Sequence, residues 1–238
     1  MRKLVIGLAL LALTACGGSP RPRFADGVID RALAGAPGMA QPSTIVAAEL
    51  GFARMAQEKG QWTAFAEYAA DDALMFVPQM VNAKDWLKQQ KDPPQSVAWQ
   101  PHQVWMSCDG SMAVTKGAWQ RGDRAGYFTT VWQRQANREY KWVMDQGDVL
   151  AQPLAEPDFI QTQIADCGSK AVVPKNAMPI DTTVKNFVSV DQSLVWTVEV
   201  WPNCSRQLAG FMASREGTMR FEQLSASDPQ GATCTRLQ

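Results

Sequence analysis

The stretch that decides the fold is GYFTTVWQRQANREYKWVMDQGDV, residues 126–149. Two runs rich in aromatic and β-branched residues flank the polar segment QANRE. That pattern is typical of a β-hairpin. The register that pairs Gln135 with Tyr140 places these residues opposite each other: Trp132 with Val143, and Thr130 with Asp145. Asp145 then lies near the end of a strand, on a face that it shares with aromatic side chains.

A second hairpin precedes the first. Residues 97–108 and 111–120 flank Asp109-Gly110, a strong two-residue turn signal. If Cys108 pairs with Ser111, His102 faces Gly117 and Gln100 faces Trp119. A glycine opposite His102 leaves open space beside the imidazole.

Helices are predicted upstream of both hairpins. Ser43 is placed to cap a helix whose apolar residues recur every three or four positions up to Gly60. A second helix is expected over residues 62–68, a short extended run over 73–77 and a third helix over 82–90. Helices followed by long antiparallel strands indicate an α+β fold.

Five segments in this order carry a family resemblance: AFAEYAADDALMFVP, VAWQP, GSMAVTKGAW, GYFTTVWQR and YKWVMDQGD. They resemble the SnoaL-like branch of the nuclear transport factor 2-like superfamily. The resemblance implies a cone, in which three helices lie in the concave face of a strongly bent sheet around an apolar pocket. Members include isomerases, cyclases, dehydratases, accessory subunits and proteins without an assigned activity, so the fold does not specify the function.

The resemblance ends near residue 152, and residues 153–238 form a separate β-rich segment. Residues 159–165 are expected to be a short helix or an extended link. Four strands are predicted beyond them, over residues 184–190, 194–200, 207–213 and 218–224. Short turns join these strands, so we expect a small antiparallel meander. Its role stays open among a lid, a dimer surface and a sheet that binds the cell envelope.

The N-terminus predicts export. Arg2 and Lys3 precede an apolar run that is too short to span a bilayer, so residues 1–15 are typical of a secretory signal peptide. The run ends in LTAC, which resembles the lipobox of bacterial lipoproteins and makes Cys16 the expected lipidation site. The alternative is ordinary cleavage with an unmodified Cys16. With residues 16–42 as a flexible tether, we expect a lipid-anchored protein of the bacterial envelope, on the outer membrane facing the periplasm.

Composition narrows the functional classes. The chain has 23 basic and 23 acidic residues, and neither a basic patch nor a long charge run suggests nucleic acid as a partner. One histidine and no C-x-x-C pair argue against a zinc site, and no cofactor is expected. Four cysteines remain beside Cys16, and an exported protein permits disulfides among them. Three connectivities are open, with Cys204–Cys234 as a mild preference.

The candidate site residues follow from the expected cone. Asp145 is a candidate general base and His102 its candidate partner, although a strand-end carboxylate that ties down backbone is the simpler interpretation. The expected ligand-pocket residues are Glu49, Phe52, Tyr68, Trp86, Trp99 and Trp132.

Three functions are compatible with this pattern. The favoured one is a module that binds a small apolar or amphipathic ligand, or serves as a scaffold, without turnover. The second is a proton-transfer enzyme, an isomerase or dehydratase, in which Asp145 works with His102 or Tyr68. The third is a protein–protein interaction module of the envelope that acts through its sheet faces, with a homodimer as one form.

Overall fold

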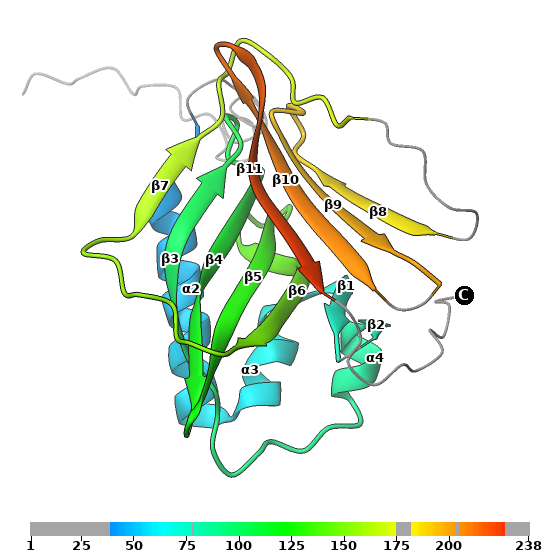
Figure 1. Ribbon diagram of the computed structural model, residues 1–238. Coiled ribbons are helices and arrows are strands. Elements are labelled where there is room, and N and C mark those ends of the chain that lie inside the picture. Colours follow the sequence, from blue (N-terminus) through cyan, green and yellow to red (C-terminus); the bar gives the residue numbers. More distant parts are fainter. Residues whose placement is uncertain (1–38, 78, 175–181, 203–204, 227–238) are drawn as a thin grey trace, which may run out of the picture.

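The computed structural model describes residues 39–77, 79–174, 182–202 and 205–226 (Figure 1). The predicted signal peptide, Cys16, Cys204 and Cys234 lie outside these ranges. The helices with described residues are α2 (Pro42–Lys59), α3 (Gln61–Tyr68) and α4 (Ala83–Leu87). None of the described helices has the length and apolar character needed to cross a membrane.

Helix α2 begins two residues earlier than predicted. Pro42 lies in its first turn and Gln41 is the N-cap, so the expected cap at Ser43 is wrong. Proline suits this place because its fixed φ is helical and the N–H that it lacks would have no partner there. Gly60, with a φ of 113°, ends α2, and α3 follows at once. Asn82 caps α4 by accepting a hydrogen bond of 3.0 Å from the Asp85 amide.

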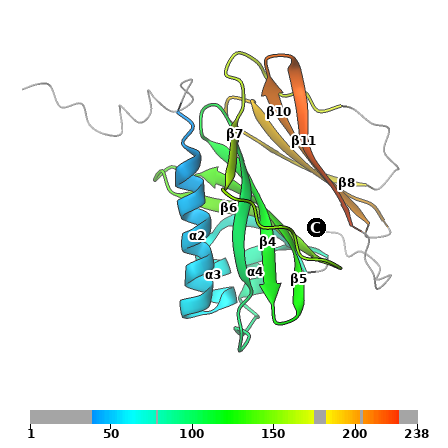
Figure 2. The ribbon, with the colours of Figure 1, turned by 60° about the vertical axis from the view of Figure 1, so that its left-hand side comes forward.

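The described residues form a seven-stranded sheet in the spatial order β2-β1-β6-β5-β4-β3-β7. It curves around α2 and α3, which cover one of its faces (Figures 1 and 2). This is the α+β arrangement that the family resemblance implied, and that prediction is confirmed. Its strands are β1 (Ala69–Phe76), β2 (Met80–Asn82), β3 (Ala98–Met106), β4 (Met112–Arg121), β5 (Arg124–Arg134), β6 (Tyr140–Leu150) and β7 (Gln161–Ile164).

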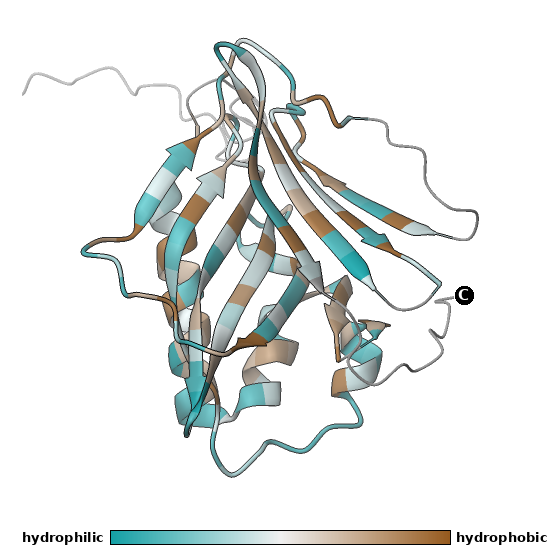
Figure 3. Cartoon of the chain, viewed as in Figure 1, coloured by the Kyte–Doolittle hydropathy of each residue, from teal (hydrophilic) through white to brown (hydrophobic). Residues whose placement is uncertain are grey.

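A second sheet packs on the other face of the first (Figure 2). Within the described residues it is a four-stranded antiparallel meander, as the sequence predicts. Trp105 of the large sheet stacks on Phe221 of the small one, with ring centroids 4.6 Å apart, inside one hydrophobic core. Hydrophobic and hydrophilic residues alternate along many of these strands (Figure 3). The strands are β8 (Thr183–Val188), β9 (Leu194–Val200), β10 (Arg206–Ser214) and β11 (Gly217–Ala226).

A β-bulge at His102 overturns the predicted register of the first hairpin. Pro101, not His102, lies opposite Gly117. The ladder skips His102 and resumes at Gln103, which lies opposite Lys116. Proline offers no N–H to the ladder at this point. A Cβ on Gly117 would collide with the backbone carbonyl of Gln100, so glycine is needed for the two strands to approach. His102 is therefore the extra residue of the bulge, and its predicted pairing with Gly117 is wrong.

The second hairpin keeps half of its predicted register. Thr130 lies opposite Asp145, as expected. A bulge between Val131 and Trp132 then places Trp132 opposite Trp142 instead of Val143. Composition gives no signal for such a bulge, because it inserts a residue without changing the alternation on either side.

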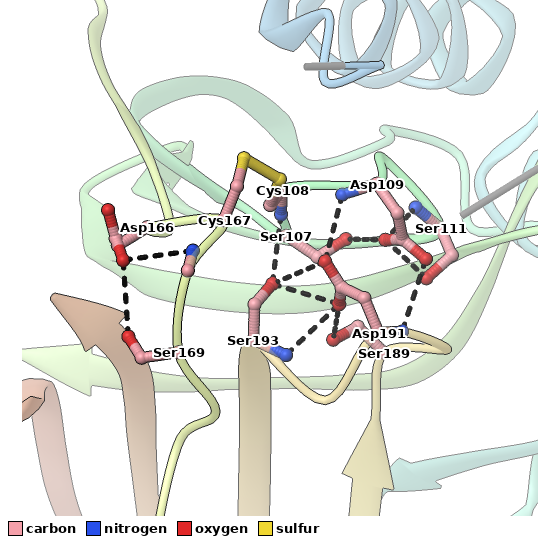
Figure 4. Close-up of a disulfide and its surroundings, with 11 residues drawn as sticks. Ser107, Cys108, Asp109, Ser111, Asp166, Cys167, Ser169, Ser189, Asp191 and Ser193 are labelled. Atoms are coloured by element: carbon pink, nitrogen blue, oxygen red, sulfur yellow. Dashed lines mark hydrogen bonds between the residues drawn. A yellow bond between two sulfur atoms is a disulfide. The ribbon is translucent and has the colours of Figure 1, made fainter. Parts of the chain in front are cut away.

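Two turns with the same hydrogen-bond pattern hold the two sheets together at one end (Figure 4). They are SCDGSM, residues 107–112, and SVDQSL, residues 189–194. In each turn one aspartate oxygen accepts hydrogen bonds from both serine hydroxyls and from the amide of the second serine. The hydroxyl of the first serine also accepts a hydrogen bond from the backbone amide five residues later in the chain.

The two turns also bind each other reciprocally. The Asp109 amide donates to Oδ2 of Asp191 over 3.0 Å, and the Asp191 amide donates to Oδ2 of Asp109 over 3.2 Å. Beside them, Cys108 forms a disulfide with Cys167, which fixes the start of the C-terminal segment to the first turn (Figure 4). The sequence left this connectivity open. The preferred pair, Cys204–Cys234, lies outside the described residues and stays a prediction.

The similarity extends beyond the turns to the strands that leave them. Trp132 of β5 lies opposite the second residue of β4, and Phe211 of β10 lies opposite the second residue of β9. Each of these two strands also has a bulge in its pairing with the following strand. The β5–β6 register shifts between Val131 and Trp132, and the β10–β11 register shifts between Gly210 and Phe211. Strands β8–β11 thus repeat β3–β6 in order, and the β10–β11 pair repeats the bulge of β5–β6, whereas the bulge at His102 has no counterpart in β8. The paired turns join the two copies.

Asp191→Asn should lower the free energy of unfolding by about 1–3 kcal/mol at neutral pH, because the carboxylate serves both turns. Burial acts to raise the pKa of Asp191, but hydrogen bonds from Ser193, Ser189 and the Asp109 amide outweigh it and hold the pKa below 3.8. A lowered pKa gives stability that is present above about pH 4 and lost as the pH falls further. Urea unfolding between pH 7 and pH 3 measures this. Asp123→Asn, at an exposed turn, is the control. Equal stability of wild type and Asp191→Asn at pH 7 would contradict the role of the paired turns.

Candidate functional site

A cavity of about 570 Å³ lies between helices α2 and α3 and the curved sheet. Its wall is mainly apolar and aromatic, and ligand sites have this size and character. The described residues that line it are Phe52, Gln61, Trp62, Phe65, Met75, Phe76, Val77, Val97, Trp99, Trp119, Arg121, Arg124, Phe128, Thr130, Asp145 and Gly147.

Asp92 fixes the helix that forms one wall of the cavity. Its carboxylate accepts hydrogen bonds from the Trp62 and Thr63 amides at the start of α3, and from the Thr63 hydroxyl over 2.6 Å. Free amides at a helix start need such partners. These bonds hold Trp62 and Phe65, one turn apart, against the cavity.

Asp145 is the carboxylate of this cavity. Its Oδ2 accepts a hydrogen bond of 2.7 Å from the hydroxyl of Thr130, across the β5–β6 ladder. Burial raises the pKa of Asp145 to about 7, the Thr130 hydrogen bond acts to lower it, and the charge of Glu49 raises it further. Near neutral pH this carboxyl is therefore poised between its acid and base forms.

Glu49 is a second carboxylate, fully buried behind the cavity wall. It accepts hydrogen bonds from the indoles of Trp99 (2.8 Å) and Trp132 (3.0 Å) and from the hydroxyl of Thr115 (2.6 Å). Burial raises the pKa of Glu49, while these three donors act to lower it. With its oxygens occupied, Glu49 connects helix α2 to three strands and is not a group open to a ligand.

The two expected partners of Asp145 lie elsewhere. His102 is buried in the β3 bulge beside a smaller cavity of about 290 Å³, where burial lowers its pKa and Glu156 raises it. Tyr68 packs in the core, stacked on Phe52 with ring centroids 5.1 Å apart. Neither is among the residues that line the cavity of Asp145.

The predicted pocket residues divide into two groups. Phe52 and Trp99 line the cavity. Glu49 and Trp132 are fully buried behind it, and Trp86 packs edge-on against Trp62, with ring centroids 5.0 Å apart. Whether any of them contacts a ligand stays a prediction.

Sequence reasoning missed several lining residues, above all Arg121 and Arg124. They flank the Gly122-Asp123 turn between β4 and β5, and RGDR is a readable turn signal. It predicts the turn but not that both arginines reach the cavity, since that depends on how far the sheet curls. Among the described residues, no group of three or more His, Cys, Asp or Glu side chains is arranged to hold a metal ion.

No protein-family model and no characterised protein matches the chain by sequence. Its structure is similar to that of a proposed ketosteroid isomerase from Parabacteroides distasonis, with 15% identity and a TM-score of 0.38, over 48% of this chain and 96% of that one. It is also similar to a proposed ketosteroid isomerase from Kribbella flavida, with 14% identity and a TM-score of 0.35, over 50% of this chain and 87% of that one. A third similar structure is that of a nuclear transport factor 2-like protein of unknown function from Burkholderia xenovorans, with 14% identity and a TM-score of 0.32, over 49% of this chain and 91% of that one. These are distant likenesses.

Asp145→Asn should stabilise the protein at pH 8 by about 1–3 kcal/mol. The folded pKa lies above the unfolded value of 3.8, so the carboxyl binds more protons in the folded state and loses stability as the pH rises from about 4 to about 7. Asparagine removes this cost and still accepts the Thr130 hydrogen bond. The gain should shrink towards zero at pH 4, as measured by urea unfolding across this range. A loss of stability at pH 8 would instead show that the carboxylate ties down the strand.

Proposed function

We propose that the chain binds a small ligand with a largely apolar body in the cavity between α2, α3 and the curved sheet. The observation that carries this proposal is the cavity itself, about 570 Å³ with aromatic walls and few polar groups. An interaction module would fill the cone with its own aromatic side chains, and a scaffold needs no internal space. The open cavity therefore favours binding over both.

Polar groups at separate places in the wall would orient such a ligand. Thr130 and Asp145 form one pair, deep in the ladder between β5 and β6. Gln61 lies at the start of α3, and its Oε1 accepts the Val97 amide over 3.1 Å. A few placed polar groups in an apolar wall are what fix a ligand's direction in sites of this kind.

The same proposal places this binding at the bacterial envelope. It is supported by the sequence alone, through the short apolar run and the LTAC motif that ends at Cys16. Lipidation of Cys16 would hold the cavity near a membrane, where apolar and amphipathic molecules are concentrated. A homodimer and the outer membrane as the anchoring surface are further predictions.

Binding is tested with N-phenyl-1-naphthylamine, a neutral probe whose fluorescence rises in apolar surroundings. The full chain should bind it, and Val97→Trp should weaken binding at least about tenfold, because Val97 lines the cavity and a larger side chain would fill it. Val149→Trp is the matched control, since Val149 is exposed and does not line the cavity. Equal binding by the Val97→Trp and Val149→Trp proteins would place the probe outside the cavity and refute the proposal.

One observation favours proton transfer as a second candidate. Asp145 combines a pKa of about 7 with a place in the cavity wall, as a general base for a carbon acid requires. His102 and Tyr68 are not among the residues that line the cavity, and the side chain hydrogen-bonded to Asp145 is that of Thr130.

If this candidate is right, the wild-type chain in D₂O should exchange the α-hydrogens of an apolar ketone such as cyclodecanone faster than buffer does. Asp145→Asn should abolish the acceleration and leave probe binding intact. NMR of the ketone measures the exchange. Equal rates for wild type and Asp145→Asn would leave binding without turnover as the function.

A further inference from the structure

We propose that Arg121 and Arg124 bind the anionic head group of an amphipathic ligand whose hydrocarbon body fills the cavity. This inference rests on the proposed ligand-binding function and names the class of ligand. The head group is a carboxylate or a phosphate monoester, since the guanidinium fork matches both.

Arg121 and Arg124 form an unfavourable arrangement of like charges. Arg121 and Arg124 are direct cross-strand partners at the end of the β4–β5 hairpin. Like charges directly opposite each other destabilise a ladder. Among the described residues, neither arginine forms an ion pair with a carboxylate. An anion placed between them would remove this repulsion.

The cavity wall carries a net positive charge. Its charged lining residues are Arg121, Arg124 and Asp145, so the wall carries a net charge of +1 when Asp145 is ionised and +2 when it is protonated. Along β5, Arg124 and Thr130 are six positions apart, which at about 3.3 Å per residue is roughly 20 Å. An anion at the arginines therefore stays remote from the Asp145–Thr130 pair.

The two ends of the cavity wall along β5 differ in their exposure to solvent. Arg124 is exposed and Arg121 half-buried, whereas Thr130 at the other end is fully buried. Phe128 and Trp119 lie between these ends and line the same cavity. A charged head at the solvent-facing end and an apolar body against the aromatic wall match this gradient.

Four probes that share a dodecyl chain test the proposal: dodecanoate, dodecyl phosphate, dodecanol and dodecyltrimethylammonium. Each displaces N-phenyl-1-naphthylamine from the full chain at a concentration below that of micelle formation. We expect both anions to bind about tenfold tighter than dodecanol, and the cation to bind weakest. A preference for dodecanoate would indicate a free fatty acid as the source, and a preference for dodecyl phosphate a lipid-derived phosphate.

The double variant Arg121→Gln/Arg124→Gln should weaken binding of both anions about tenfold and change that of dodecanol less than twofold. Arg215→Gln, at the exposed β10–β11 turn, is the matched control and should leave all four affinities unchanged. Raising the salt from 0.05 M to 0.5 M should weaken anion binding to wild type and to Arg215→Gln, but not to the double variant, because salt screens exposed charges.

Failure of the arginine assignment and failure of the proposed ligand-binding function give different results with these probes. Equal binding of dodecanoate and dodecanol by wild type would overturn the assignment of the arginines and leave the cavity as an apolar site. Equal loss of both in the double variant would also overturn it, since the arginines would then shape the cavity without selecting charge. If no probe binds, dodecanol included, the proposed function itself fails.

Discussion

The buried carboxylate of Glu49 is the interaction on which the first module depends. It is fully buried on α2 and is hydrogen-bonded to Trp99, Thr115 and Trp132, which come from three successive strands. An unpaired buried charge would cost several kcal/mol, so the helix and the curved sheet are stable only when all three donors are in place. One residue of α2 thus joins the helix to three strands of the curved sheet that encloses the cavity.

The same carboxylate links the packing to the chemistry. The charge of Glu49 is one of the causes that raise the pKa of Asp145, together with burial. Glu49, which joins the helix to the sheet, thus also contributes to raising the pKa of Asp145 to about 7. Sequence reasoning placed Glu49 in the pocket, but the structure uses it behind the wall, where it acts on the cavity through its hydrogen bonds and its charge.

Alternation and turn signals were sufficient to predict the long strands, the meander and the α+β class, because these depend on which residues are buried. The short strand β2 was not predicted, and β7 lies where a short helix or an extended link was expected. Alternation and turn signals were also sufficient for the Thr130–Asp145 pair. They failed at His102 and Val143, where one bulge residue shifts the ladder without altering the pattern. The repeat SCDGS and SVDQS is visible in the sequence, yet it becomes informative only when Asp109 and Asp191 are seen to bind each other across two sheets. The cavity lining was predicted least well, since it is set by the curl of the sheet.

The chain itself shows what a purely structural aspartate looks like. Asp109 is buried, and its Oδ1 alone accepts three hydrogen bonds inside its turn. Asp191 is bonded in the same way, and its pKa is lowered. Asp145 differs in each respect: its one described hydrogen bond comes from Thr130, its pKa is raised, and it lines a cavity. If the Asp145→Asn protein is the more stable one at pH 8, the carboxylate is kept at a cost to stability, and its role then lies in what enters the cavity and not in the strand that carries it.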